Sequence, residues 1–262
     1  MTLLEAAAIL LAGVGAGTIN TVVGSGTLIT FPTLLAFGVP PVTANMSNSL
    51  GLVPGSVAGA VGYRRELAGQ RAQVLRFLVF SLTGGVLGAI LLLVLPPDAF
   101  EAIVPVLIGL GVLLVAFGPR LSAYVAGRRA EGEERPAGVH WWVPVAIFAT
   151  GVYGGYFGAA QGVLLMGVLG LGLTDTLQRL NAMKNVLAAG VNLIAGVIFA
   201  VVAELELFGG DAEIDWSLVA LIGVGSVAGG FLGASVGRRL PPNVLRAIIV
   251  VVGVIAIVAI LA

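Results

Sequence analysis

Long apolar segments occupy most of this chain and decide what it can fold into. They cover residues 3–22, 43–62, 74–95, 100–118, 141–159, 186–203, 216–237 and 243–261. A helix needs about 20 apolar residues to cross the hydrocarbon core of a bilayer. Two further segments, 26–38 and 162–173, are shorter and suit half-helices or re-entrant segments. The pattern predicts an all-α, polytopic membrane protein with about eight long membrane helices and two short half-helices.

The composition supports this class and excludes several others. Only 10% of the residues are charged, against about 25% in soluble globular proteins, so polar groups are too few to cover a surface in water. The chain has no cysteine and a single histidine, His140, which excludes disulfides and the usual multi-histidine metal site. We therefore expect no cofactor, no bound metal and no nucleic-acid partner. The chain begins Met-Thr-Leu-Leu-Glu without a basic residue, which indicates a first membrane helix rather than a cleaved signal peptide.

The two halves of the chain share motifs in the same order. Residues 84–89 (GGVLGA) resemble 229–234 (GGFLGA), and Leu-Pro-Pro occurs at both 95–97 and 240–242. Both pairs are separated by 145 residues (84 to 229 and 95 to 240). Earlier in each half, Asn48 aligns with Asn185. The shared order predicts two membrane repeats, residues 1–118 and 141–262, joined by a linker at 119–140.

Charges in equivalent loops have opposite signs. The loop at 63–76 carries four arginines and one acid, whereas its counterpart at 204–215 carries five acids and no base. The turn at 96–101 has two acids and no base, and its counterpart at 238–246 has three arginines. Because basic loops stay in the cytoplasm, equivalent loops should lie on opposite sides of the membrane. The charges thus predict inverted-topology repeats in the cell membrane, a cytoplasmic linker at 119–140 and two extracytoplasmic termini.

Each half also contains one glycine-rich interruption. In inverted-repeat transporters the substrate binds near the bilayer midplane, where interrupted helices present unsatisfied backbone groups. A helix that starts after such a break offers free N–H groups and a positive dipole end, which suit an anion. The alternative is that the glycines only let helices pack closely, which we favour for the glycines at 84–85 and 229–230. The candidate substrate-binding residues at the two breaks are Gly24, Ser25, Gly26, Thr27, Gln161 and Gly162.

The helix after each break is polar near its start. The candidate substrate-binding residues there are Asn45, Ser47 and Asn48 in the first half, and Asn181, Lys184 and Asn185 in the second. Spacings of three and four residues place the asparagines of each group on one helix face. These side chains either bind the substrate or hydrogen-bond between helices, as polar residues in membranes commonly do, and both interpretations stay open.

Lys184 is the only lysine in the chain. A charged residue inside a membrane segment is costly and marks a functional site by default. Lys184 would neutralise an anionic substrate. The alternative is that it belongs to the cytoplasmic end of its helix together with Arg179, and follows the positive-inside bias.

Several of these motifs resemble the TauE/SafE family of sulfite and organosulfonate exporters. They are residues 24–28 (GSGTL) with 31–32 (FP), 44–49 (ANMSNS), 154–159 (GGYFGA) and 181–185 (NAMKN). The resemblance covers nearly the whole chain. It implies a permease that moves small sulfur-containing anions, such as sulfite or sulfonates, without ATP hydrolysis. The implied partners are the small anionic substrate and the lipid bilayer, and homo-oligomerisation is left open.

The leading hypothesis is a secondary transporter that uses alternating access, with the breaks and polar helices lining its site. An anion channel and a carrier for a different small solute are the alternatives. An enzyme is not expected, because the chain has no paired intramembrane aspartates, no metal-ligand cluster and no Ser–His arrangement. No Walker-type loop occurs either.

Overall fold

The computed structural model describes residues 1–130, 139–205, 213–236, 250–251 and 254, and these residues form α-helices and short connections without a strand. The prediction of an all-α membrane protein is confirmed. The helices are α1 (Leu3–Val22), α2 (Thr27–Ala36), α3 (Pro41–Gly62), α4 (Arg71–Val94), α5 (Pro97–Ala130), α6 (Trp142–Tyr156), α7 (Gln161–Gly172), α8 (Leu177–Glu204) and α9 (Trp216–Val236). The predicted short half-helices are α2 and α7. Helix α5 runs on to Ala130 and so includes part of the predicted linker.

Five of these helices are long and apolar enough to cross a membrane, namely α1, α4, α8, α9 and the part of α5 up to Phe117. Helix α6 has only 15 residues, and α3 contains the polar Asn and Ser residues described above. The expected segment at 243–261 lies almost entirely outside the described residues, as do the arginines at 238–246 and the second Leu-Pro-Pro motif. The total of about eight long helices therefore stays a prediction.

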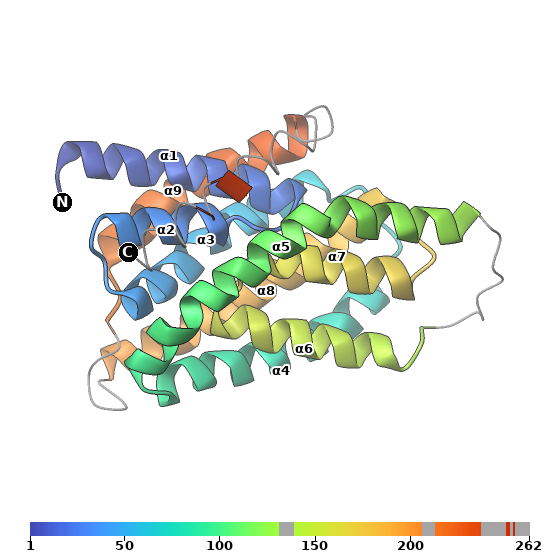
Figure 1. Cartoon of the computed structure of the whole chain (residues 1–262). Helices are drawn as coiled ribbons and strands as arrows, with labels where there is room; N and C mark the ends of the chain where they lie inside the picture. The colour runs from blue at the N-terminus through green and yellow to red at the C-terminus, as the bar shows by residue number, and fades with distance from the viewer. Residues whose placement is uncertain (131–138, 206–212, 237–249, 252–253, 255–262) are drawn as a thin grey trace.

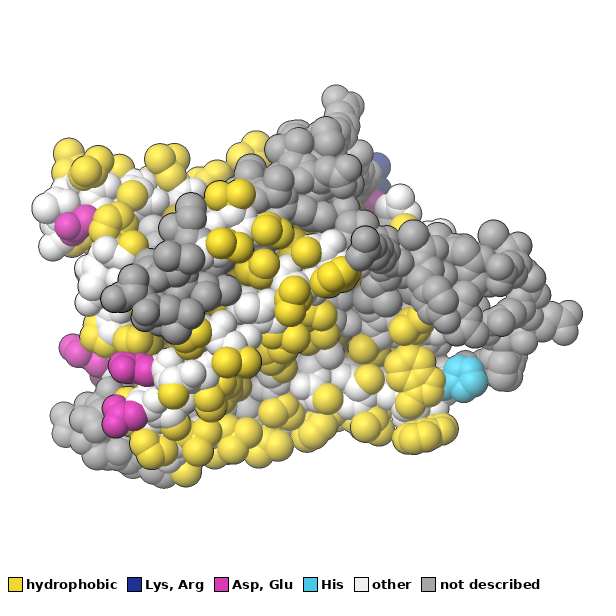
Figure 2. All heavy atoms as spheres, in the orientation of Figure 1, with side chains coloured by type: hydrophobic (Ala, Val, Ile, Leu, Met, Phe, Trp, Pro, Cys, Tyr) yellow, Lys and Arg dark blue, Asp and Glu magenta, His cyan; other side chains and the backbone are white. Residues whose placement is uncertain are grey.

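Large apolar side chains cover the outside of the described helices. They include Leu75, Val79 and Val94 on α4, and Val106 and Leu113 on α5, each at least half exposed. Figure 2 shows hydrophobic side chains across the middle of one face, acidic side chains at one end and the histidine at the other. Such a surface suits a lipid environment, because exposed apolar area of this extent is unusual for a protein in water.

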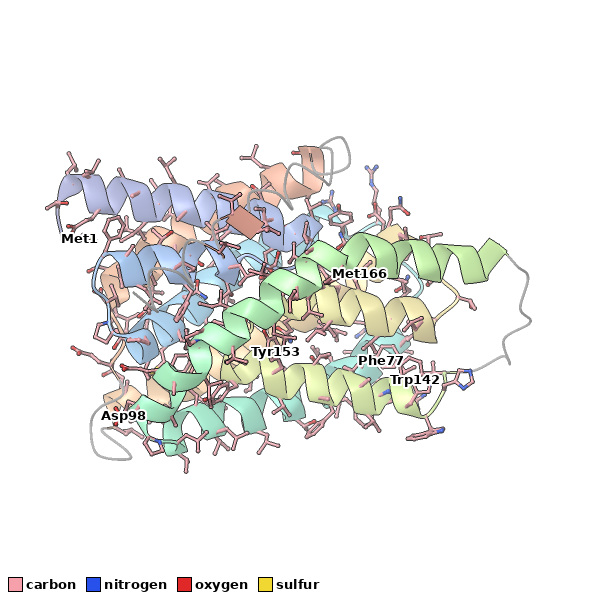
Figure 3. All side chains as sticks on the ribbon, viewed as in Figure 1. Met1, Phe77, Asp98, Trp142, Tyr153 and Met166 are labelled. Atoms are coloured by element: carbon pink, nitrogen blue, oxygen red, sulfur yellow. The ribbon has the colours of Figure 1, made fainter. Side chains whose placement is uncertain are left out.

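The broken helices form two hairpins that enter from opposite ends of the molecule. Helices α1 and α2 start from and return to the end that holds Met1 and Asp98, whereas α6 and α7 start from and return to the end near Trp142 (Figures 1 and 3). Both hairpins turn inside the molecule. Two inverted repeats would produce this arrangement.

Glycines let the fourth helix of each half pack closely against the first helix of the other half. A Cβ atom added to Gly84 or Gly88 on α4 would collide with a backbone carbonyl of α6. A Cβ added to Gly229 or Gly233 on α9 would collide in the same way with α1. These contacts support the packing interpretation of the motifs at 84–89 and 229–234, because small residues are what close helix approach in membranes requires.

Candidate substrate site at the two helix breaks

The two helix breaks are built in the same way. Gly24 ends α1 at φ +92° and donates its N–H to the Ile19 carbonyl at 3.0 Å. Gly158 ends α6 at φ +78° and donates its N–H to the Tyr153 carbonyl at 3.1 Å. Glycine adopts this left-handed conformation without steric cost. Its N–H bonds the carbonyl five residues earlier in the chain, and this hydrogen bond closes the helix end. The glycine-rich motifs therefore break both helices, as the sequence predicts.

The breaks touch each other at Gly24 and Gly162. The Gly162 N–H donates to the Gly24 carbonyl at 2.9 Å. A Cβ atom added to Gly24 would lie 2.8 Å from the Gly162 carbonyl carbon, a separation that real Cβ atoms do not show. This contact brings the two candidate groups of residues together. It also engages one of the N–H groups that the start of α7 would otherwise offer to an anion.

The carbonyls at the end of α1 receive their hydrogen bonds from α8. The Lys184 Nζ donates to the Asn20 carbonyl at 3.0 Å and to the Thr21 carbonyl at 3.3 Å. Asn181 and Asn185 donate their Nδ2 atoms to the same Thr21 carbonyl at 3.1 and 3.4 Å. The last carbonyls of a helix have no partner within the helix and carry its negative dipole end. A cation and two amides therefore cap this break.

At the end of α6, one amide donor serves a carbonyl of the last turn among the described residues. Asn45 on α3 donates its Nδ2 to the Tyr156 carbonyl at 2.9 Å. Phe157 follows directly and packs edge-on against Phe31 and Phe100, with ring centroids 5.0 and 5.9 Å away. Each polar helix thus caps the broken helix of the other half. Asn45, Asn181 and Asn185 share one role, which is to cap the end of a broken helix.

Ser47 and Asn48 have hydrogen-bond partners within the protein. The Ser47 hydroxyl accepts the Asp215 N–H at 3.0 Å. The Asn48 amide accepts a hydrogen bond from Thr30 and donates one to the Thr27 hydroxyl at 3.3 Å. Asn48 therefore fixes the start of α2, and through it the position of the first break.

Several buried polar atoms around the breaks have no hydrogen-bond partner among the described residues. They are Ser25 Oγ, Asn45 Oδ1, Tyr156 Oη, Gln161 Nε2 and Asn181 Oδ1. The orientation of the two asparagines is fixed, because only an amide nitrogen can donate to a carbonyl. Buried polar atoms in native proteins are nearly always satisfied, so each such atom calls for a partner such as water or a ligand. These five atoms therefore put unused donors and acceptors at both helix breaks.

Lys184 and Arg179 lie in different environments. Arg179 pairs with Asp175 at 2.9 Å, and its side chain is 37% exposed. It also donates to the Ala68 carbonyl, and Gln70 contacts Asp175, so the 63–70 loop and the start of α8 lie together. Lys184, five residues further along α8, is 0% exposed and has no carboxylate within salt-bridge distance among the described residues. The described part of the chain also contains no cluster of His, Asp or Glu that could hold a metal ion.

Sequence reasoning missed the backbone acceptors that organise the site. The carbonyls of Asn20, Thr21 and Tyr156 receive the side chains singled out on α3 and α8. The sequence does contain a signal for these carbonyls, because they belong to the last helical turn before each glycine break. The final carbonyls of a helix always need outside donors when they are buried.

Comparison with known proteins identifies the family. The family model described as "Sulfite exporter TauE/SafE" matches residues 9–260. The chain belongs to the TauE/SafE family. This result confirms the resemblance seen in the break and Asn motifs, and shows a membrane transporter family.

Curated relatives agree with this assignment over most of their length. The "probable membrane transporter protein YfcA" of Escherichia coli K12 is 30% identical over 258 residues, covering 92% of this chain and 83% of that protein. The "probable membrane transporter protein ORF9" of Sinorhizobium sp. is 28% identical over 254 residues, covering 94% and 88%. A "probable membrane transporter protein" of Haemophilus influenzae is 26% identical over 239 residues, covering 91% and 88%. No solved structure matches the chain significantly.

Proposed function

We propose that this member of the TauE/SafE family is a secondary transporter that moves a small sulfur-containing anion, such as sulfite or a sulfonate, by alternating access. The observation that carries the proposal is the meeting of two helix breaks at Gly24 and Gly162, near buried polar atoms that have no partner in the described part of the chain. In inverted-repeat transporters, interrupted helices of this kind bind the substrate, and one half rocks against the other around the site.

Charge and hydrogen-bonding capacity both favour an anion at this place. Lys184 supplies a positive charge that no described carboxylate neutralises. The Ser25 hydroxyl and the Gln161 amide nitrogen are unused donors, and donors of this kind suit the oxygens of sulfite or a sulfonate. We assign the substrate to these three side chains, whereas Gly24, Gly26 and Gly162 let the protein backbone pack closely around the site.

The remaining candidates act by positioning the breaks. Asn45, Asn181 and Asn185 hold the carbonyl ends of α6 and α1, and Asn48 holds the start of α2 through Thr27. Ser47 connects α3 to the start of α9. Lys184→Ala and Asn48→Ala are both expected to reduce transport without preventing membrane insertion. The Asn48→Ala substitution removes the hydrogen bonds that connect Asn48 to α2.

Ser25→Ala tests the proposed site, with Ser81→Ala as its matched control. Both hydroxyls are buried and lack a partner among the described residues, so neither substitution removes an internal hydrogen bond. Ser81 lies on α4, which forms neither break. In proteoliposomes, Ser25→Ala should raise the KM for sulfite or methanesulfonate by about tenfold, since a hydrogen bond to a charged group contributes about 1.5 kcal/mol. Ser81→Ala should transport like the parent.

The same proteoliposomes distinguish the alternatives. A carrier shows saturation and counterflow, in which an internal pool of substrate drives uptake of labelled substrate. A channel shows conductance without counterflow. Sulfur anions should compete with one another and acetate should not. If acetate competes equally, a carrier for a different small solute replaces the sulfur-anion proposal, and unchanged KM in Ser25→Ala contradicts the assigned site.

We further propose that the end of the molecule with the 63–70 loop and the start of α4 faces the cytoplasm and that the N-terminus faces outward. Arginines gather in this loop and in the first turns of α4, and Arg179 lies against the loop, as the positive-inside bias requires. The chain has no cysteine, so single-cysteine variants report the orientation directly. Thr2→Cys should react with a membrane-impermeant thiol reagent in intact cells, whereas Ala68→Cys should react only after the membrane is permeabilised. The reverse result would invert the proposed topology.

A further inference from the structure

The end of α1 has the chemistry of a cation site, and a side chain occupies it. In inverted-repeat transporters, unwound carbonyls and the C-terminal ends of half-helices coordinate the coupling cation. Here the carbonyls of Asn20 and Thr21 at the end of α1 bind the Lys184 ammonium instead. The nitrogen lies 3.0 and 3.3 Å from the two oxygens.

We propose that the Lys184 ammonium is a tethered cation that takes the place of a bound Na⁺ or K⁺ at the end of α1. The protein then needs no monovalent metal ion to hold its first helix break. This inference goes beyond the transport proposal, because it concerns which cation stabilises the fold and not which anion is carried.

The surroundings of Lys184 fit a cation that is balanced by dipoles. The side chain is fully buried, and no described carboxylate pairs with it. The negative end of the α1 dipole faces it, and this end is equivalent to about half an elementary charge. Asn181 and Asn185 donate to the same Thr21 carbonyl. The ammonium is thus held by backbone oxygens at a helix end, which is how transporters hold a coupling ion.

The oxygens around Lys184 also suit a monovalent ion. They are neutral carbonyls, and the described residues contain no cluster of acidic side chains to hold a divalent metal. Truncation of Lys184 to alanine would leave a space next to these acceptors. A small cation can fill that space and restore the lost interactions.

Three variants at one position separate charge from volume. Lys184→Ala removes the charge and opens the space, Lys184→Met removes the charge but fills the space, and Lys184→Arg keeps a cation. The measurement is the Tm of the purified, detergent-solubilised protein without substrate. NaCl or KCl is titrated against choline chloride, so that chloride concentration and ionic strength stay constant.

The wild type and Lys184→Arg should show no saturable dependence on Na⁺ or K⁺. Lys184→Ala should have a lower Tm in choline and gain roughly 5 °C in a saturable manner when Na⁺ or K⁺ replaces it, because an ion that binds the folded state raises its stability. Lys184→Met should have a lower Tm that neither ion restores.

Three results would overturn the proposal. They are a saturable rise in wild-type Tm with Na⁺ or K⁺, a Lys184→Ala variant that neither ion stabilises, and a Lys184→Met variant that responds as Lys184→Ala does. Failure to isolate folded Lys184→Ala in either NaCl or KCl would also contradict the proposal, because either cation should fill the space and stabilise the fold. Because the assay contains no substrate, its outcome is independent of whether the protein carries sulfur anions.

Discussion

The two helix breaks end their helices with the same glycine geometry but differ in how they are capped. At the first break, one ammonium and two amides from α8 serve the carbonyls of Asn20 and Thr21. At the second break, the Asn45 amide alone is seen to serve the Tyr156 carbonyl. The two breaks thus end their helices alike, while among the described residues only the first is capped by a charged side chain. At the substrate site that we propose between them, the positive charge would lie on one side only, which would favour a charged substrate over a neutral one.

The largest effect is expected where the two breaks touch. Gly24→Ala places a Cβ against the Gly162 backbone at a left-handed φ, so either the contact or the break must move. We expect a loss of more than about 4 kcal/mol, or no folded protein, because neither backbone can yield cheaply. Thermal unfolding of the purified protein measures this effect.

Gly38→Ala is the matched control for Gly24→Ala. Gly38 also has a positive φ, of +77°, but a Cβ added there meets nothing within 4 Å. Only backbone strain of about 1 kcal/mol should result. If Gly24→Ala is no less stable than Gly38→Ala, the contact between the breaks does not hold the fold together.

The next largest effect follows from the unequal capping. Asn45→Ala leaves the buried Tyr156 carbonyl without its amide donor, and this should cost about 2 kcal/mol. Asn181→Ala leaves the Thr21 carbonyl with Lys184 and Asn185 as donors, so its loss should stay below about 1 kcal/mol. Chemical denaturation of both variants under one set of conditions compares them. Equal losses would show that the two caps are equivalent despite their different numbers of donors.

The sequence predicts the helical framework and the position of both breaks, because apolar length and glycine clusters are local properties. The polar start of each helix after a break and the single lysine of the chain also single out Asn45, Asn181 and Lys184 as residues with a special role. What a sequence cannot supply is the partner of each side chain. Asn45 lies 111 positions from Tyr156 and Lys184 lies 164 from Asn20, so these contacts depend on how the halves cross in space. The motif alignment accordingly pairs Asn48 with Asn185, yet Asn185 caps the end of α1 whereas Asn48 bonds the start of α2.

The smallest expected effect concerns a backbone difference at the second break. Ala160 begins α7 at φ +61°, the one described non-glycine residue with a positive φ, whereas Gly26 begins α2 at φ −59°. Replacing a buried alanine by glycine normally costs about 1.5 kcal/mol, from the lost methyl group and the freer unfolded chain. At Ala160, relief of left-handed strain returns about 1–2 kcal/mol, so Ala160→Gly should change the stability by less than about 1 kcal/mol. Ala159→Gly, at an equally buried neighbour without a positive φ, should show the full loss, and equal losses at both positions would mean that α7 starts without strain.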